Sequence, residues 1–148
     1  MLSGEYTHSI DSKGRLIVPA KLREQLGEQF VVTVGFDSCL FVFQKTEWEM
    51  FERQLRSLDL FNADAREINR VFAGSAQECT PDKMGRILLP AGLRDYAGLK
   101  KDVVLVGVLN RVEIWDGEAW NARNSNNRKN MDDIAARLQN LGVSLQQG

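Results

Sequence analysis

The stretch Asp11-Ser-Lys-Gly-Arg-Leu-Ile-Val-Pro-Ala-Lys-Leu-Arg23 occurs twice in this chain of 148 residues. It returns 71 residues later as Asp82-Lys-Met-Gly-Arg-Ile-Leu-Leu-Pro-Ala-Gly-Leu-Arg94, with seven of the thirteen positions identical. The other positions mostly keep their apolar or polar character. Two related copies at a fixed offset predict an internal duplication of one small β-rich unit.

Each copy of the motif predicts a turn, a short strand and a short helix. An aspartate accepts N–H bonds from a turn backbone, and a glycine permits positive φ. The predicted turn-forming residues are Asp11, Gly14, Asp82 and Gly85. A strand rich in branched residues follows each turn and ends at a proline. Arg15 and Arg86, directly after the turn glycines, are therefore expected at the tips of two hairpins.

Hydrophobic periodicity predicts the other elements. Strands are expected at residues 5–10, 15–18, 30–34, 39–43, 86–89, 103–106 and 112–115, and helices at 20–26, 46–58, 62–72, 91–97 and 131–141. A capping box at Thr46 is expected to begin the long first linking helix. The polar residues 123–130 are expected to be loose, and the tail beyond 141 to be frayed. The offset grows to 72 by Trp48 and Trp120, so the duplication extends well beyond the motif.

The composition limits the class of protein. Apolar residues make up 43% of the chain and charged residues 26%, as in soluble globular proteins. No apolar run approaches the ~20 residues of a membrane span, and the first residues lack the pattern of a signal peptide. Cys39 and Cys79 have no metal-ligand spacing and are expected to be buried in a reducing cytoplasm. We expect a cytoplasmic protein without a metal or other cofactor.

The charges are unevenly distributed. A net charge of −1 argues mildly against nucleic-acid binding, for which a pI above about 9 is usual. However, four cations fall within eleven residues of the first motif and are opposed by Asp11 alone: Lys13, Arg15, Lys21 and Arg23. A basic face on a nearly neutral chain is thus expected, and such a face gains DNA affinity by multiplicity.

Several blocks of the chain resemble the MraZ family. They are residues 5–23, Cys39-Leu-Phe-Val-Phe43 with Trp48, Val104-Leu-Val-Gly107 and Glu113-Ile-Trp115, with a DxxxR motif in each half. The resemblance implies an α+β, β-rich fold of two tandem swapped-hairpin units, the double-split β-barrel of the AbrB and SpoVT type. The expected boundaries are 5–47 and 76–119 for the repeats, 48–75 for linking helices and 120–148 for a C-terminal helical or flexible segment.

The resemblance also implies a function. Members of the family are bacterial transcription regulators associated with the division and cell-wall gene cluster. They bind short direct repeats in promoter DNA, assemble as ring homo-oligomers and use the DxxxR arginines to meet double-stranded DNA. A nucleoid-associated regulator with no small-molecule substrate and no membrane partner is therefore expected.

The candidate DNA-binding residues are Arg15, Lys13, Arg86 and Lys83. A guanidinium forms a planar fork that can hold guanine O6 and N7, or a phosphate. The alternative is that Arg15 closes its hairpin by pairing with Asp11, and that Lys13 is only a solvated lysine. Because Met84 stands at the position of Lys13, with Lys83 one step earlier, we hypothesise that the two turns contact DNA unequally.

Other residues leave alternatives open. Arg23 and Arg94 either support the DNA face or make a salt bridge or subunit contact, and Lys21 has no duplicated counterpart. His8 is expected to be a polar strand residue, and both Trp48 and Trp120 are expected to anchor helices. One apolar set belongs either to the core or to a subunit interface: Phe51, Leu55, Ile68 and Phe72.

Two other classes of function compete with a DNA-binding regulator. The first is a non-catalytic protein-interaction or oligomeric scaffold with the same fold. The second is a small enzyme, for which the sequence offers little support. No carboxylate pair, Ser/His set or glycine-rich phosphate loop is duplicated or suitably placed. We therefore expect no enzymatic activity.

Overall fold

A computed structural model describes residues 1–143, and residues 144–148, within the tail expected to be frayed, lie outside the described part. The chain forms two compact units, Met1–Gly117 and a C-terminal unit that begins at Glu118. Both copies of the motif lie in the first unit. Among the described residues, no helix has the length and apolar character needed to cross a bilayer.

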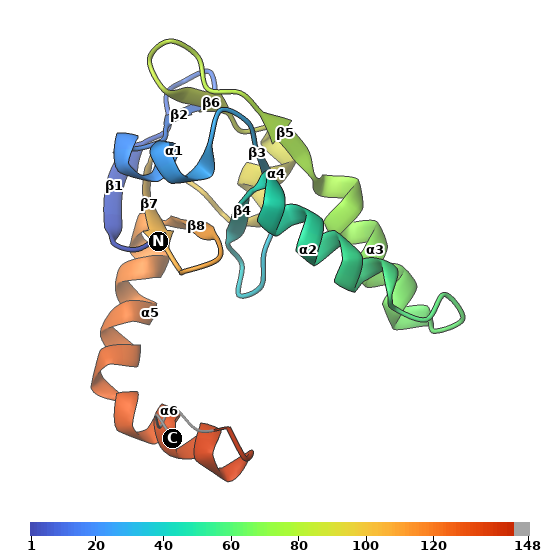
Figure 1. Cartoon of the computed structure of the whole chain (residues 1–148). Helices are drawn as coiled ribbons and strands as arrows, with labels where there is room; N and C mark the ends of the chain where they lie inside the picture. The colour runs from blue at the N-terminus through green and yellow to red at the C-terminus, as the bar shows by residue number, and fades with distance from the viewer. Residues whose placement is uncertain (144–148) are drawn as a thin grey trace. The chain divides into compact units, whose positions relative to one another are not determined.

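The first unit is built on a six-stranded antiparallel sheet (Figure 1). Its strands run in the order β1-β7-β8-β4-β3-β5. Their bounds are β1 Glu5–Ser9, β7 Asp102–Gly107, β8 Val112–Asp116, β4 Leu40–Gln44, β3 Phe30–Val34 and β5 Gln77–Cys79. Most residues of the four central strands are apolar and buried, and β8 also buries Glu113 and Asp116.

The two repeats are interleaved. Strand β1 of the first repeat pairs with β7 of the second, and β5 of the second repeat pairs with β3 of the first. The two motif strands, β2 (Arg15–Ile17) and β6 (Arg86–Leu88), pair with each other as a separate two-stranded ribbon. This arrangement confirms the predicted α+β, β-rich fold of swapped hairpins, with a six-stranded sheet that remains open rather than closing.

Two short helices follow the ribbon strands, and two longer ones link the repeats. Helices α1 (Ala20–Leu26) and α4 (Ala91–Tyr96) each begin after a proline. Helix α2 (Lys45–Arg56) packs on β4, and α3 (Ala63–Ser75) packs on β3. Helix α3 is capped by the Asn62 side chain, which accepts a hydrogen bond from the Ala65 N–H at 3.0 Å.

An aromatic cluster joins α2 and α3 to the sheet. Phe51 stacks on Phe43 with ring centroids 5.2 Å apart and meets Phe72 edge to face at 5.1 Å. Trp48 lies against Phe43 at 5.9 Å, so its predicted role as a helix anchor is confirmed. Leu55 is also buried. Leu55 and Phe72 thus belong to the core of this chain, whereas Phe51 and Ile68 are half-buried.

Two local predictions are wrong. Strand β4 runs directly into α2 at Lys45, so Thr46 lies inside the helix, where its hydroxyl accepts a hydrogen bond from the Gln44 side chain instead of capping. Residues 123–129 are helical, because α5 spans Gly117–Lys129. With Glu118 in its first turn and two cations in its last, α5 has charges that favour its helix dipole. Helix α6 (Met131–Asn140) follows as predicted.

The two outer edges of the sheet differ. Strand β1 pairs with β7 over five residues, and the Ile10 N–H then donates to the Lys101 carbonyl at 2.8 Å. Strand β5 pairs with β3 over only three residues. Pro81, at the position of Ile10, has no N–H to donate. In the strand register, Glu28 lies opposite Pro81 as Lys101 lies opposite Ile10. The Glu28 carbonyl therefore receives no backbone hydrogen bond from Pro81.

Candidate nucleic-acid interface

The first turn is organised by the carboxylate of Asp11. Its Oδ1 accepts the backbone N–H groups of Lys13 and Arg15, each at 2.9 Å. Its Oδ2 accepts the Arg15 Nε–H at 2.7 Å. The Asp11 carbonyl accepts the Gly14 N–H at 3.0 Å, which closes the turn. One aspartate therefore holds both the turn backbone and the arginine at its end.

The second turn repeats this arrangement. Asp82 Oδ1 accepts the backbone N–H groups of Met84 and Arg86, each at 2.9 Å, and Oδ2 accepts the Arg86 Nε–H at 2.8 Å. The Gly85 N–H donates to the Asp82 carbonyl at 2.9 Å. The two turns are thus the same structure, built twice from a motif that shares its aspartate, glycine and arginine.

The turn aspartates are held in their ionised form. Hydrogen bonds from the Arg15 backbone lower the pKa of Asp11 below its ordinary value, and the Arg15 side chain and the Lys13 backbone add to this effect. The pKa of Asp82 is lowered in the same way, first by the Arg86 backbone. Near neutral pH, each turn therefore carries a carboxylate that keeps its arginine in place.

The ribbon brings the turns of the two repeats together. The Val18 N–H donates to the Gly85 carbonyl, and the Leu89 N–H donates to the Gly14 carbonyl, both at 2.9 Å. In the strand register, Leu16 lies opposite Ile87 at the centre of the ribbon. Each turn glycine is therefore bonded to the strand of the other repeat, which fixes the two arginine-bearing tips relative to each other.

Arg23 and Arg94 have parallel structural roles across the repeats. Arg23 donates from Nε to the Val18 carbonyl at 2.8 Å, and Arg94 does the same to the Leu89 carbonyl at 2.9 Å. Both turn glycines have positive φ, +82° at Gly14 and +80° at Gly85. A Cβ added at Gly85 would lie 2.7 Å from the Arg23 Cζ, and one at Gly14 would lie 3.2 Å from the Arg94 Cζ.

These crossed contacts explain why each turn needs a glycine. Positive φ disfavours residues with a Cβ, and the guanidinium of the other repeat occupies the space that a Cβ would need. Sequence reasoning left the role of Arg23 and Arg94 open. The repetition of a glycine and an arginine at the same offset was the available signal, but nothing in one copy shows that the contact crosses to the other.

The alternative given for Arg15, a pairing with Asp11, occurs in the structure, and the same carboxylate also holds the turn backbone. The ion pair uses Nε, and among the described residues no hydrogen bond engages the Arg15 Nη atoms. Arg86 is held in the same way. Each guanidinium is oriented by its Nε edge, which leaves its far end for a ligand.

The lysines of the turns are exposed, and the turns differ at their tips. Lys13 and Lys83 are both exposed, and Met84, which takes the position of Lys13, is 64% exposed. The two motifs together contain seven cations and two carboxylates, a net charge of +5 on a chain whose total is −1. The predicted basic region is thus concentrated on segments that the ribbon holds side by side.

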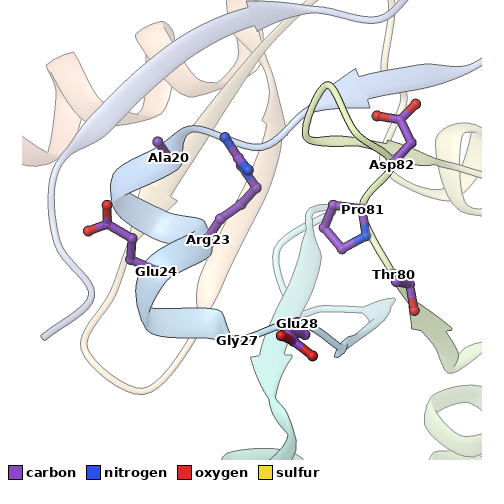
Figure 2. Close-up of a pocket in the computed structure, with 8 residues that line it drawn as sticks. All are labelled: Ala20, Arg23, Glu24, Gly27, Glu28, Thr80, Pro81 and Asp82. Atoms are coloured by element: carbon purple, nitrogen blue, oxygen red, sulfur yellow. The ribbon is translucent and has the colours of Figure 1, made fainter.

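A pocket lies between α1 and the loop that enters the second turn (Figure 2). It has a volume of about 600 Å³ and is lined by Ala20, Arg23, Glu24, Gly27, Glu28, Thr80, Pro81 and Asp82. In Figure 2, the Pro81 ring faces α1 and the Asp82 carboxylate points away from the helix. At the corresponding place in the other half, the Ile10 side chain is buried. Pro81, which has no N–H to continue the edge pairing, is one of the residues that line the pocket.

The remaining polar candidates form no recognisable chemical site. His8 lies in β1 opposite Val103. Burial raises the pKa of the Cys79 thiol to about 11, which keeps it protonated and unreactive near neutral pH. Among residues 1–143, no cluster of three or more histidine, cysteine or acidic side chains is arranged to hold a metal ion.

Comparison with known proteins agrees with the duplication. The family model described as "MraZ protein, putative antitoxin-like" matches residues 1–71 and again residues 72–141. A relative from Lachnoclostridium phytofermentans, named Transcriptional regulator MraZ, is 52% identical over 97% of this chain and 99% of its own length. A relative of the same name from Thermoanaerobacter sp. (strain X514) is 49% identical over 97% of this chain and 100% of its own length. Another, from Heliobacterium modesticaldum, is 51% identical over 93% of this chain and 96% of its own length.

Proposed function

The chain belongs to the MraZ family, and on that premise we propose that it is a transcriptional regulator that binds specific DNA sequences through its two turns. The observation that carries the proposal is the pairing of β2 with β6, which places two identically built arginine-bearing turns on one ribbon. A two-stranded ribbon has a width that the major groove of B-DNA admits. The protein acts without catalysis, in the cytoplasm at the nucleoid.

The turn arginines are suited to reading guanine. A guanidinium held through Nε by an aspartate presents its Nη atoms in a fixed plane, and two such donors match guanine O6 and N7. Each good bidentate contact discriminates against the wrong base by about 1–3 kcal/mol. Asp11 and Asp82 act as positioning residues, because their lone pairs are occupied by the turn and the arginine.

The lysines at the tips supply contacts that do not depend on sequence. Lys13 binds a phosphate as a point charge, and Lys83 contributes less because it stands one position earlier in its turn. The first turn thus contacts DNA through Lys13 and Arg15, and the second mainly through Arg86. A single ribbon makes few contacts, so a tight complex requires several ribbons to act together.

We extend the proposal to the assembly and the target. Copies of the chain form a ring-like homo-oligomer that presents several ribbons to direct repeats in a promoter. The repeats precede the protein's own gene in a division and cell-wall gene cluster. Tethering in the ring raises the effective concentration of each ribbon, so overall affinity exceeds that of one subunit by about 10²-fold or more.

The experiment is a binding titration with the DNA upstream of the protein's own gene at several salt concentrations. It compares the wild-type chain with Arg15→Ala and with the control Arg70→Ala, which removes an exposed arginine of α3. We expect the wild type and the control to prefer this DNA over scrambled DNA, and to bind it less tightly as salt rises. Arg15→Ala should lose that preference. Binding that ignores sequence and survives Arg15→Ala would contradict the proposal.

A non-catalytic interaction scaffold is the second candidate, and one observation favours it. The loop between α2 and α3 exposes Leu60 to 70% and Phe61 to 91%, and large exposed apolar side chains often mark protein contacts. This candidate predicts that Phe61→Ser abolishes partner capture or self-assembly while Arg15→Ala has no effect on DNA. Both surfaces can operate in one protein, because they lie on separate elements.

A further inference from the structure

Two aliphatic side chains are exposed on the ribbon between the turn arginines. Ile17 is 38% exposed and Leu88 is 60% exposed, whereas their neighbours Leu16 and Ile87 are buried. Successive residues of a strand point to opposite faces of a sheet. The outer face of the ribbon therefore carries Arg15, Ile17, Arg86 and Leu88.

The strand register sets how these four side chains lie. Arg15 is directly opposite Leu88, and Ile17 is directly opposite Arg86. Cross-strand partners have Cβ atoms about 4.5–5.5 Å apart. Each arginine thus has an aliphatic side chain of the other repeat at its side, and the two pairs are arranged alike about the centre of the ribbon.

The charge around this face indicates what covers it. The two turns and the ribbon carry four cations, Lys13, Arg15, Lys83 and Arg86. The two carboxylates of the turns, those of Asp11 and Asp82, already hold the arginines and the turn backbone. A basic face with a few aliphatic side chains is complementary to the major groove, whose walls are phosphates. Within that groove, the exposed apolar group is the C5-methyl of thymine.

We infer that Ile17 and Leu88 are specificity-determining residues that contact thymine methyl groups beside the guanines read by Arg15 and Arg86. The inference rests on the proposed function and deepens it, because it names the base that the ribbon prefers next to guanine. Base pairs are spaced by about 3.4 Å, so a side chain about 5 Å from an arginine reaches the next base pair or the one after it. The preferred site therefore has thymine within two base pairs of each contacted guanine.

The test compares two versions of the same promoter duplex, one with thymine and one with deoxyuridine at every thymine position. The substitution removes only the C5-methyl groups. We expect the wild-type chain to bind the deoxyuridine duplex about fourfold less tightly for each methyl group that is buried. Single thymine-to-deoxyuridine changes then locate the effect within two base pairs of guanines whose contact is lost in Arg15→Ala or Arg86→Ala.

Variants of the chain connect the effect to the two side chains. In Ile17→Ala/Leu88→Ala, the two duplexes should bind with equal affinity, because the apolar contacts are absent. The matched control is Met50→Ala, which truncates a 53% exposed apolar side chain of α2 and should keep the wild-type ratio. Both positions are exposed, so the double variant should fold, and its thermal unfolding checks this.

The outcomes separate the inference from the proposed function. If the wild type binds both duplexes equally, or if the double variant keeps the wild-type ratio, the inference is wrong while DNA binding stands. If the double variant changes the mass of the assembly and not the ratio, the two side chains form a subunit contact and the inference is likewise overturned. If the wild type prefers neither duplex to scrambled DNA, the proposed function fails, and the inference fails with it.

Discussion

The two repeats build the same turn but differ on either side of it. In both turns, the aspartate accepts two backbone N–H groups and an arginine Nε–H at 2.7–2.9 Å. At the tips, however, Lys13 faces solvent in the first repeat and Met84 in the second. At the sheet edge, five residue pairs join β1 to β7 but only three join β5 to β3.

The difference shows which constraints the duplication retains. The turn glycine and the last arginine of the motif are identical in both copies. The glycine of each repeat lies against the arginine of the other repeat, Gly14 against Arg94 and Gly85 against Arg23. The tips of the turns have diverged, and so have the sheet edges, although both edges pair a strand of one repeat with a strand of the other. The two copies therefore retain the side chains that build the turns and join them across the ribbon, while the exposed tips and the length of the edge pairing differ.

The largest effect is expected at the divergent tip. Lys13→Ala/Arg15→Ala should weaken binding to promoter DNA about a hundredfold, because it removes a base contact and a phosphate contact. Arg86→Ala should weaken it about tenfold and reduce the dependence of affinity on salt by a smaller amount. Titration of both variants against salt by fluorescence anisotropy measures both quantities. Equal losses of affinity and of salt slope in the two variants would show that the turns contact DNA equally.

The second effect concerns the divergent edge and is measured as stability. Ile10→Pro removes the hydrogen bond to the Lys101 carbonyl and part of a buried side chain, so the free energy of unfolding should fall by about 2–3 kcal/mol. Pro81→Ile makes the opposite change in the other half. It should alter stability by less than about 1 kcal/mol, because the edge there is already open.

Urea denaturation at one fixed protein concentration compares these two variants, since assembly makes apparent stability depend on concentration. A loss at Pro81→Ile as large as the loss at Ile10→Pro would mean that the two edges carry equal weight despite their different pairing.

The sequence predicted the turns, most strands and the short helices because each has a local signal: a glycine, a proline or a run of branched residues. It did not indicate that Asp11 holds the turn backbone and the Arg15 side chain at once, because only the structure shows that each carboxylate oxygen takes one of these contacts. The crossed contacts of Arg23 and Arg94 also have no signal within one copy. Helix α5 was missed because its asparagine-rich sequence has low helix propensity and no apolar stripe.

The third effect tests the crossed contacts. An alanine in place of Gly85 is strained by the positive φ, and its Cβ would lie 2.7 Å from the Arg23 Cζ. An alanine in place of Gly14 has the same backbone strain, but its Cβ would lie 3.2 Å from the Arg94 Cζ. Gly85→Ala should lower the free energy of unfolding by about 2 kcal/mol and Gly14→Ala by less. Gly98→Ala is the control, because Gly98 also has positive φ but has no atom close to the added Cβ.

The part of the loss due to Arg23 can be isolated in a double variant. In an Arg23→Ala background, Gly85→Ala should cost no more than Gly98→Ala does in the wild type, since only the backbone term is left. An undiminished cost would mean that the guanidinium moves aside freely and that φ alone requires the glycine.

The smallest effect is the response to acid. The lowered pKa of Asp11 and of Asp82 means that each ionised carboxylate stabilises the folded chain above its unfolded pKa of about 3.9, and this stabilisation is lost as pH falls through the lower folded value.

Asparagine keeps an acceptor for the turn backbone but not the charge. The stability difference between the wild type and Asp11→Asn should thus be constant from pH 7 to about 5 and should shrink below about pH 4. Denaturation curves across that range should show the same behaviour for Asp82→Asn, because the same contacts lower both pKa values. A difference that persists at pH 2, or two variants that respond differently, would show that the two turns are not electrostatically equivalent.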